Sequence, residues 1–155
     1  MDALEKATAY LNMKPHTARE VTDYLIRKGY ETGETEEAVK QLAEYGYIDD
    51  LAYAKMYFGY GFDKGRGKDR IVRELAGKGV NRDIIERAFS ELEEVPDERE
   101  MAFALAKQIL MESDADLKDM SYDEKQKLRA KIVRRLASRG FSGGLCYSAA
   151  RETVK

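Results

Sequence analysis

The stretch that decides the fold is RIVRELAGKGV, residues 70–80. Ile71 and Leu75 lie four residues apart, about one helical turn, so their side chains share one face of a helix. Gly79 ends the pattern, because glycine lacks a Cβ and readily adopts the left-handed conformation that closes many helices. Lys78 beside it suits the negative end of the helix dipole. The stretch predicts a short amphipathic helix that ends in a glycine turn.

The same pattern occurs three times along the chain. Residues 20–30 read EVTDYLIRKGY, and residues 131–141 read KIVRRLASRGF. Each copy has an apolar residue four positions before a leucine, then a basic residue, a glycine and an apolar residue. Internal repeats of this kind are typical of arrays whose units pack on their neighbours.

A further helix is predicted on each side of every repeated stretch. An A-x-x-apolar-apolar pattern precedes each copy, beginning at Ala7, Ala54 and Ala106. After each glycine comes a residue type that favours helix starts, and the expected N-caps are Thr35, Asn81 and Ser142. No segment alternates with the period of a strand. The sequence therefore predicts an all-α fold of three tandem three-helix repeats, at residues 2–46, 48–92 and 97–152.

Charge is strongly segregated, although the formal net charge is only −2. Residues 1–63 carry a net −5 and residues 91–124 a net −9, whereas residues 64–90 carry +4 and residues 125–155 carry +8. The two basic blocks leave room for an anionic partner despite the near-neutral total. With one cysteine, no long apolar run and no signal-peptide pattern, we expect a cytoplasmic protein without membrane contact.

The residues that could support catalysis or cofactor binding form no recognised pattern. The glycine-rich stretch before Arg70 fails as a phosphate-binding P-loop, since Gly67-Lys68 would need a glycine at Phe62. His16 and Cys146 are the single histidine and cysteine, too few for a zinc site of those residues. Asp49-Asp50 is interpreted as a helix cap rather than a metal pair. We therefore predict no enzyme and assign no catalytic, cofactor-binding or metal-binding residue.

Basic side chains recur on one face of the second and third repeated helices. Lys127, Lys131 and Arg134 follow the spacing i, i+4, i+7, which places them on one side of a helix. Like charges at this spacing repel by a few tenths of a kcal/mol per pair, so helix stability alone does not favour them. We therefore predict a surface for an anionic partner, the basic stripe, made of Lys64, Arg66, Lys68, Arg70, Arg73, Lys127, Lys131, Arg134 and Arg135.

Three stretches resemble the RecX regulatory proteins of bacteria. They are GYIDDLAYAKMY at 46–57, KGRGKDRIVRELAGKGV at 64–80 and RAKIVRRLASRGFS at 129–142. The resemblance covers nearly the whole chain and keeps the order of the repeats. It implies an elongated, curved array of three-helix repeats. Where many family members carry Arg-Ser, this chain has His16-Thr17, so the first repeat departs from the family's basic pattern at that position.

The resemblance also implies a function. It implies a non-enzymatic modulator that binds the RecA filament on DNA and typically inhibits its recombinase, ATPase and co-protease activities. We also expect a monomer. Contacts to phosphates of single- or double-stranded DNA are compatible with the basic stripe. The alternative is a DNA-binding protein of helix-turn-helix type that acts without RecA, and the acidic first repeat fits that alternative less well. A third possibility is a purely structural interaction module that acts away from nucleic acid.

Overall fold

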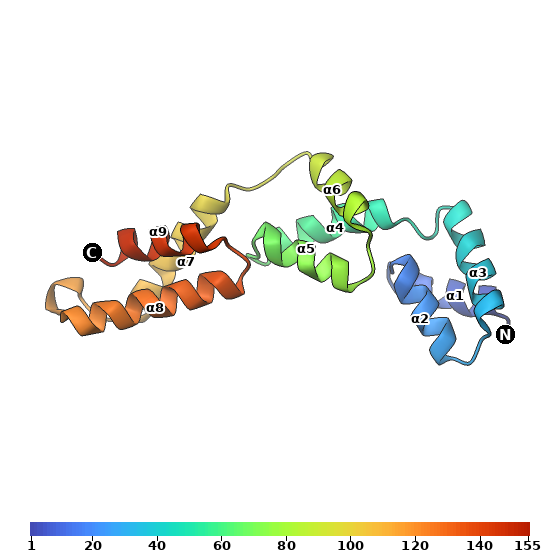
Figure 1. Ribbon diagram of the computed structural model, residues 1–155, viewed down its shortest axis with the longest axis horizontal. Helices are drawn as coiled ribbons and strands as arrows, with labels where there is room; N and C mark the ends of the chain where they lie inside the picture. The colour runs from blue at the N-terminus through green and yellow to red at the C-terminus, as the bar shows by residue number, and fades with distance from the viewer. The chain divides into compact units, whose positions relative to one another are not determined.

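The structure, a computed structural model, describes residues 1–155 and is entirely helical (Figure 1). This confirms the predicted all-α fold. The helices are α1 (Ala3–Met13), α2 (Ala18–Arg27), α3 (Thr32–Glu44), α4 (Asp50–Asp63), α5 (Lys68–Gly77), α6 (Arg82–Ser90), α7 (Glu98–Glu112), the 3₁₀ helix η1 (Leu117–Asp119), α8 (Tyr122–Ser138) and α9 (Gly143–Thr153).

The chain packs as two compact units whose dividing line passes through α4 and α5. One unit contains residues 1–59 and 72–93, and the other contains residues 60–71 and 94–155. In the first unit α1, α2 and α3 pack on one another, and in the second unit α7, α8 and α9 do the same. Two three-helix groups of the predicted type are therefore directly visible as packed sets.

The three glycine turns are confirmed. Gly29, Gly79 and Gly140 have φ angles of 94°, 87° and 95°, in the left-handed region that glycine tolerates best. The residue after each glycine donates its N–H to a carbonyl five positions back, as Val80 does to Leu75 at 3.1 Å. This is the Schellman arrangement, which satisfies carbonyls at the end of the helix.

A capping box precedes α2, and two of the three predicted N-caps are confirmed. The Thr17 hydroxyl accepts the N–H of Glu20, and the Glu20 side chain accepts the N–H of Thr17, which completes a capping box. Asn81 and Ser142 cap α6 and α9 through their side chains.

Thr35 is not an N-cap, and that prediction was wrong. Helix α3 begins at Thr32 after Glu31, which makes no side-chain cap bond. The N-cap position therefore lies two residues after Gly29, as the N-caps Asn81 and Ser142 lie two residues after Gly79 and Gly140. Thr35 is instead fully buried, at the position that Ile85 and Cys146 occupy in the other repeats, and its hydroxyl has no hydrogen-bond partner.

The predicted apolar positions form the cores. In the first unit Ala7, Val21 and Leu25 are fully buried in one cluster with Ala3, Ala38, Leu42 and Ile48. In the second unit Ala106, Ile132 and Leu136 are fully buried with Ala102, Ile109, Leu128, Phe141, Cys146, Ala149, Ala150 and Val154. Each core joins one face of three helices, so packing on one another supplies most of the stability of these helices.

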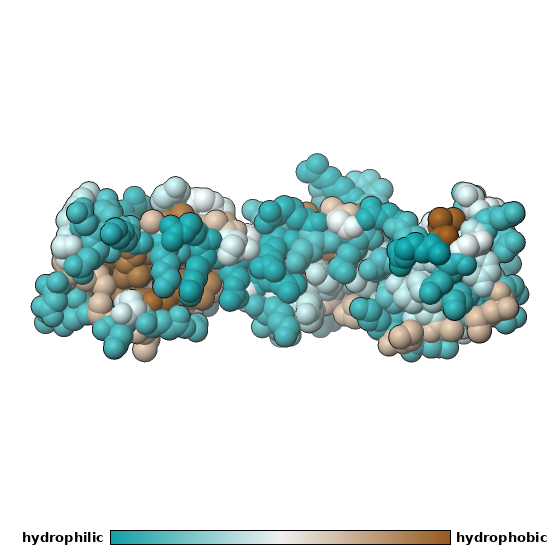
Figure 2. Space-filling view, turned by 90° about the horizontal axis from the view of Figure 1, so that it is seen from below, coloured by the Kyte–Doolittle hydropathy of each residue, from teal (hydrophilic) through white to brown (hydrophobic).

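On the face shown in Figure 2 hydrophilic residues prevail, and the widest hydrophobic area lies over the α7–α9 segment. None of the helices combines the length and apolar character that crossing a bilayer requires.

Candidate functional site

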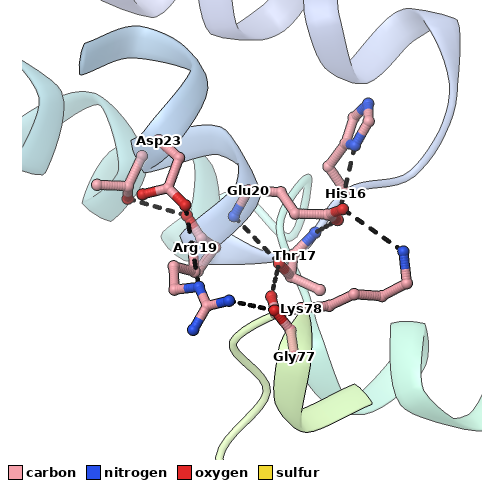
Figure 3. Close-up of polar contacts among 9 residues, drawn as sticks. His16, Thr17, Arg19, Glu20, Asp23, Gly77 and Lys78 are labelled. Carbon is pink, nitrogen blue, oxygen red and sulfur yellow. Dashed lines mark hydrogen bonds and ion pairs between the residues drawn. The ribbon is translucent and has the colours of Figure 1, made fainter. Parts of the chain in front are cut away.

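The start of α2 meets the end of α5 in a contact that we call the first joint (Figure 3). The Thr17 hydroxyl donates to the Lys78 carbonyl oxygen at 2.6 Å, and the Arg19 guanidinium donates to the Gly77 carbonyl oxygen. The Lys78 Nζ lies 3.7 Å from a Glu20 carboxylate oxygen. The last carbonyls of a helix have no partner inside the helix, so these donors satisfy groups that would otherwise need water.

The two adjacent aspartates before α4 have different roles. Asp49 Oδ1 accepts the N–H of Ala52 at 3.0 Å, which is the predicted N-cap bond. Asp50 Oδ1 accepts the N–H of Ala18 at 3.0 Å, at the start of α2. Burial raises the pKa of Asp50, and the bond from Ala18 opposes that rise. Asp50 therefore belongs to the first joint, and it reaches a helix in the preceding repeat.

His16 is packed among aromatic side chains rather than exposed as a catalytic group. It is buried, and its ring stacks on Tyr10 at 3.7 Å between centroids, while Tyr10 stacks on Tyr24 at 3.8 Å. Its Nδ1 lies 3.7 Å from a Glu20 oxygen. Burial lowers the pKa of His16, and the Glu20 carboxylate opposes that shift. The neutral ring is thus the favoured form beside the first joint.

A second joint connects the start of α5 to the end of α8. The Gly67 N–H donates to the Arg139 carbonyl oxygen at 2.6 Å, and the Arg70 guanidinium donates to the Ser138 carbonyl oxygen at 3.2 Å. The Lys68 N–H donates to a Glu98 carboxylate oxygen at 2.5 Å. Glu98 opens α7 as Asp50 opens α4, so its carboxylate has the role of Asp50 in the first joint.

The two joints share one scheme. In each, a guanidinium from the start of one repeat's second helix binds a carbonyl next to the glycine turn of the following repeat. A Cβ on Gly79 would lie 2.7 Å from the Arg19 Cδ, and a Cβ on Gly140 would lie 2.7 Å from the Arg70 nitrogen. A Cβ on Gly29 would meet nothing within 4 Å. Glycine is therefore needed at the two joints for space as well as for its backbone conformation.

The structure gives the predicted basic stripe residues different surroundings. Arg70 is part of the second joint. The Lys64 Nζ and the Arg66 guanidinium lie over the Tyr60 ring, 5.7 and 5.4 Å from its centre. Arg135 lies 3.6 Å from a Glu112 oxygen. These four side chains thus have contacts of their own within the second unit.

The remaining stripe residues lie on α5 and α8. Arg73 is exposed on α5 and belongs to the first unit, while the side chain of Lys68 is half-buried in the second. Lys127 and Arg134 are exposed and Lys131 is half-buried on α8, where the helical spacing aligns them. That these residues form part of a binding surface stays a prediction, as it does for the rest of the basic stripe.

A groove runs between α8 and α9 beside this row of cations. Its volume is about 750 Å³, and it is lined by Gln126, Arg129, Ala130, Val133, Arg134, Tyr147, Ala150 and Arg151. Arg129 is held in place, because its Nε donates to the Val154 carbonyl oxygen at 2.7 Å and its Nη1 to Gln126 at 3.0 Å. Tyr147, by contrast, is 64% exposed at the edge of the groove. Sequence reasoning did not identify Tyr147 or Arg151.

No group of three or more His, Cys, Asp or Glu side chains lies close enough to hold a metal ion. Cys146 is buried, its thiol contacts the Phe141 carbonyl oxygen at 3.5 Å, and burial raises its pKa. A buried thiol of raised pKa is a weak nucleophile.

Comparison with known proteins identifies the repeats. A family model described as the first three-helix domain of RecX matches residues 3–42, and one described as the second three-helix domain matches residues 49–88. The "Regulatory protein RecX" of Vibrio vulnificus is 36% identical over 142 residues, which cover 92% of this chain and 86% of the relative.

The chain belongs to the RecX family.

Other RecX relatives are longer. The "Regulatory protein RecX" of Lactobacillus delbrueckii is 33% identical over 155 residues, which cover 98% of this chain but 54% of that protein. The Listeria monocytogenes relative is 31% identical and is likewise covered over 54%. The chain therefore spans about half the length of these curated relatives.

Solved RecX structures share the fold. The crystal structure of RecX from Lactobacillus salivarius matches with a TM-score of 0.77 at 24% identity, over 97% of this chain and 94% of that one. A second crystal structure of regulatory protein RecX also gives a TM-score of 0.77, at 22% identity, over 70% of its chain. The RecX fold is therefore present along nearly the whole chain, and the family is a regulatory one by name.

Proposed function

We propose that this RecX-family chain binds the RecA filament assembled on DNA and lowers its recombinase, ATPase and co-protease activities. The observation that carries the proposal is family membership, since two successive RecX domains occur in order and the match to the Vibrio relative covers most of both proteins. We further propose that the protein acts as a cytoplasmic monomer, without catalysis of its own, and that its repeats span residues 2–46, 48–92 and 97–152.

The proposed contact surface is the basic stripe. Its α8 part fits best, because Lys127, Lys131 and Arg134 form one row on an α-helix and the 125–155 segment carries a net +8. Such a row attracts phosphates or acidic protein surfaces, and the attraction weakens as salt is added. Arg70 has a second role, because it also binds the Ser138 carbonyl oxygen.

The test is RecA ATP hydrolysis on single-stranded DNA with increasing amounts of this protein. We expect hydrolysis to fall as the protein approaches stoichiometric amounts. The double variant Lys127→Glu/Lys131→Glu should inhibit less, whereas Lys107→Glu, on the exposed side of α7, should inhibit like the wild type. Unchanged hydrolysis at equimolar wild-type protein would contradict the proposal.

The second candidate is a helix-turn-helix DNA-binding protein that acts without RecA. The two basic blocks favour it, since they could neutralise phosphates of a duplex. The net −5 of residues 1–63 argues against it, because an acidic first repeat repels a duplex laid along the whole chain. Tight, sequence-specific binding to bare duplex DNA at physiological salt would favour this candidate over the first.

A further inference from the structure

We propose that the groove between α8 and α9 binds a single strand of nucleic acid, with one base stacked on Tyr147 and the backbone phosphates on Arg134 and Arg151. The groove is about 750 Å³ in volume and lies entirely within the second compact unit. It holds no residue of either joint. The proposal rests on the proposed function only in that a RecA filament carries such a strand.

The groove exists because the third repeat has small residues where the other repeats have large ones. Ala130 lies ten residues before Gly140, and the residues ten before Gly79 and Gly29 are Asp69 and Arg19. Ala150 lies ten residues after Gly140, where the other repeats have Phe89 and Val39. The two alanines leave a floor with little side-chain bulk, so the space between the helices stays open.

The ring at the edge is also specific to the third repeat. Tyr147 lies seven residues after Gly140, and the residues at that distance from Gly29 and Gly79 are Glu36 and Glu86. A glutamate there would repel an anion, whereas an exposed tyrosine presents a flat face on which a base can stack. Tyr147 is 64% exposed, although a tyrosine ring in a core would be mostly covered.

The charges around the groove suit a polyanion. Arg129 is held by the Val154 carbonyl oxygen and by Gln126, while Arg134 and Arg151 are exposed on the two walls. Arg134 also belongs to the row with Lys127 and Lys131, whose members are about 4.5–6 Å apart along α8. Arg134 on the α8 wall and Arg151 on the α9 wall offer cations to the phosphates of a strand, and Tyr147 on the α9 wall offers a ring to one of its bases.

An acidic protein segment is the competing occupant, and the ring argues against it. The arginines alone would serve a row of carboxylates, so an exposed aromatic side chain adds nothing to that recognition. Guanidinium groups and tyrosine rings are both surfaces on which bases stack. The open alanine floor fits a flat base at the edge of the groove.

The experiment measures fluorescence anisotropy of a labelled oligothymidylate titrated with the protein. Tyr147→Ala should weaken binding roughly 5- to 150-fold, the loss expected for one stacked base, and Tyr147→Phe should restore it. Ala130→Phe should also weaken binding, since it fills the groove without removing charge. Tyr45→Ala, which changes an exposed tyrosine of the first unit, is the matched control and should bind like the wild type.

Salt dependence supplies a second readout. Arg134→Ala should lower the slope of log affinity against log salt by about 0.7, the share of one phosphate on a single strand. Arg82→Ala, at a side chain that is 88% exposed on α6, should leave the slope unchanged. Circular dichroism of every variant should match the wild type.

Two outcomes would overturn the inference. One is a wild-type protein that does not bind oligothymidylate. The other is unchanged oligothymidylate binding in folded Tyr147→Ala and Ala130→Phe; if these variants also lose RecA inhibition, the groove takes a protein segment instead. Failure of the proposed function is separate: wild-type protein would then leave RecA ATP hydrolysis unchanged, whether or not it binds the strand through Tyr147.

Discussion

Gly140→Ala should destabilise the protein more than Gly29→Ala, although both glycines end a helix in the same way. Their φ angles are 95° and 94°, so an alanine meets the same backbone strain at either position. The surroundings differ. A Cβ at Gly140 would lie 2.7 Å from the Arg70 nitrogen and 3.0 Å from its Cα, whereas a Cβ at Gly29 would meet nothing within 4 Å.

The expected losses in the free energy of unfolding follow from two contributions, the backbone strain and the steric overlap of the new Cβ. The left-handed conformation costs an alanine about 1–2 kcal/mol, and Gly29→Ala should lower the free energy of unfolding by that amount. At Gly140 the new methyl group also meets backbone atoms of α5, which cannot rotate away as a side chain can. Overpacking typically adds about 1–3 kcal/mol, so Gly140→Ala should cost about 2–5 kcal/mol.

Urea unfolding followed by circular dichroism at the helical band measures both variants. The difference between their losses in unfolding free energy measures the steric overlap at the second joint, because the cost of the left-handed backbone conformation is the same for both variants. Equal losses for Gly29→Ala and Gly140→Ala would refute the argument that Gly140 is needed for space against Arg70. In that case the close approach of α5 to the end of α8 would be absent in solution.

Three further predictions concern the first repeat and the core. Leu75 is fully buried, so Leu75→Ala should lower the free energy of unfolding by about 2–5 kcal/mol in urea titrations; a loss below 1 kcal/mol would contradict its core position. Thr35→Val should raise that free energy by about 1 kcal/mol, because it removes a buried hydroxyl without a partner and keeps the shape; destabilisation would show that the hydroxyl is satisfied. Because burial holds the pKa of His16 below its ordinary value, the unfolded chain binds a proton more readily, and stability should fall as pH drops through 6.5 toward the folded pKa. His16→Phe, which keeps a ring on Tyr10, should flatten that part of the pH profile measured by thermal unfolding; an unchanged profile would assign the pH dependence to other groups.

The features that the sequence predicted well are local ones. A glycine turn depends on the conformation of one residue and on hydrogen bonds within six, so RKGY, GKGV and SRGF could be recognised directly. The error at Thr35 was also local, since threonine favours N-caps and the sequence offers two threonines near that helix start. The distance from the preceding glycine was the better guide, because Asn81 and Ser142 both lie two residues after theirs.

The joints could not be predicted in the same way. Thr17 and Lys78 are 61 positions apart, and the acceptor is a backbone carbonyl, which every residue has. Arg70 was assigned to a binding surface because it lies in a basic row, and no pattern in the sequence shows that it binds the Ser138 carbonyl oxygen. The groove was also not predicted. It forms because Ala130 and Ala150 have small side chains that leave space between the helices, and no sequence motif marks such a space.

Helix α8 is longer than the equivalent helices α2 and α5, and its additional residues contribute to the proposed binding sites. Helices α2 and α5 begin eleven residues before their glycines and use that start for a joint, whereas α8 begins eighteen residues before Gly140. The additional two turns supply Gln126 to the groove and Lys127 to the row of cations. The segment that is a joint in the first two repeats is therefore the middle of a longer helix in the third. Variants in that extra part of α8 should therefore alter binding while leaving both joints intact.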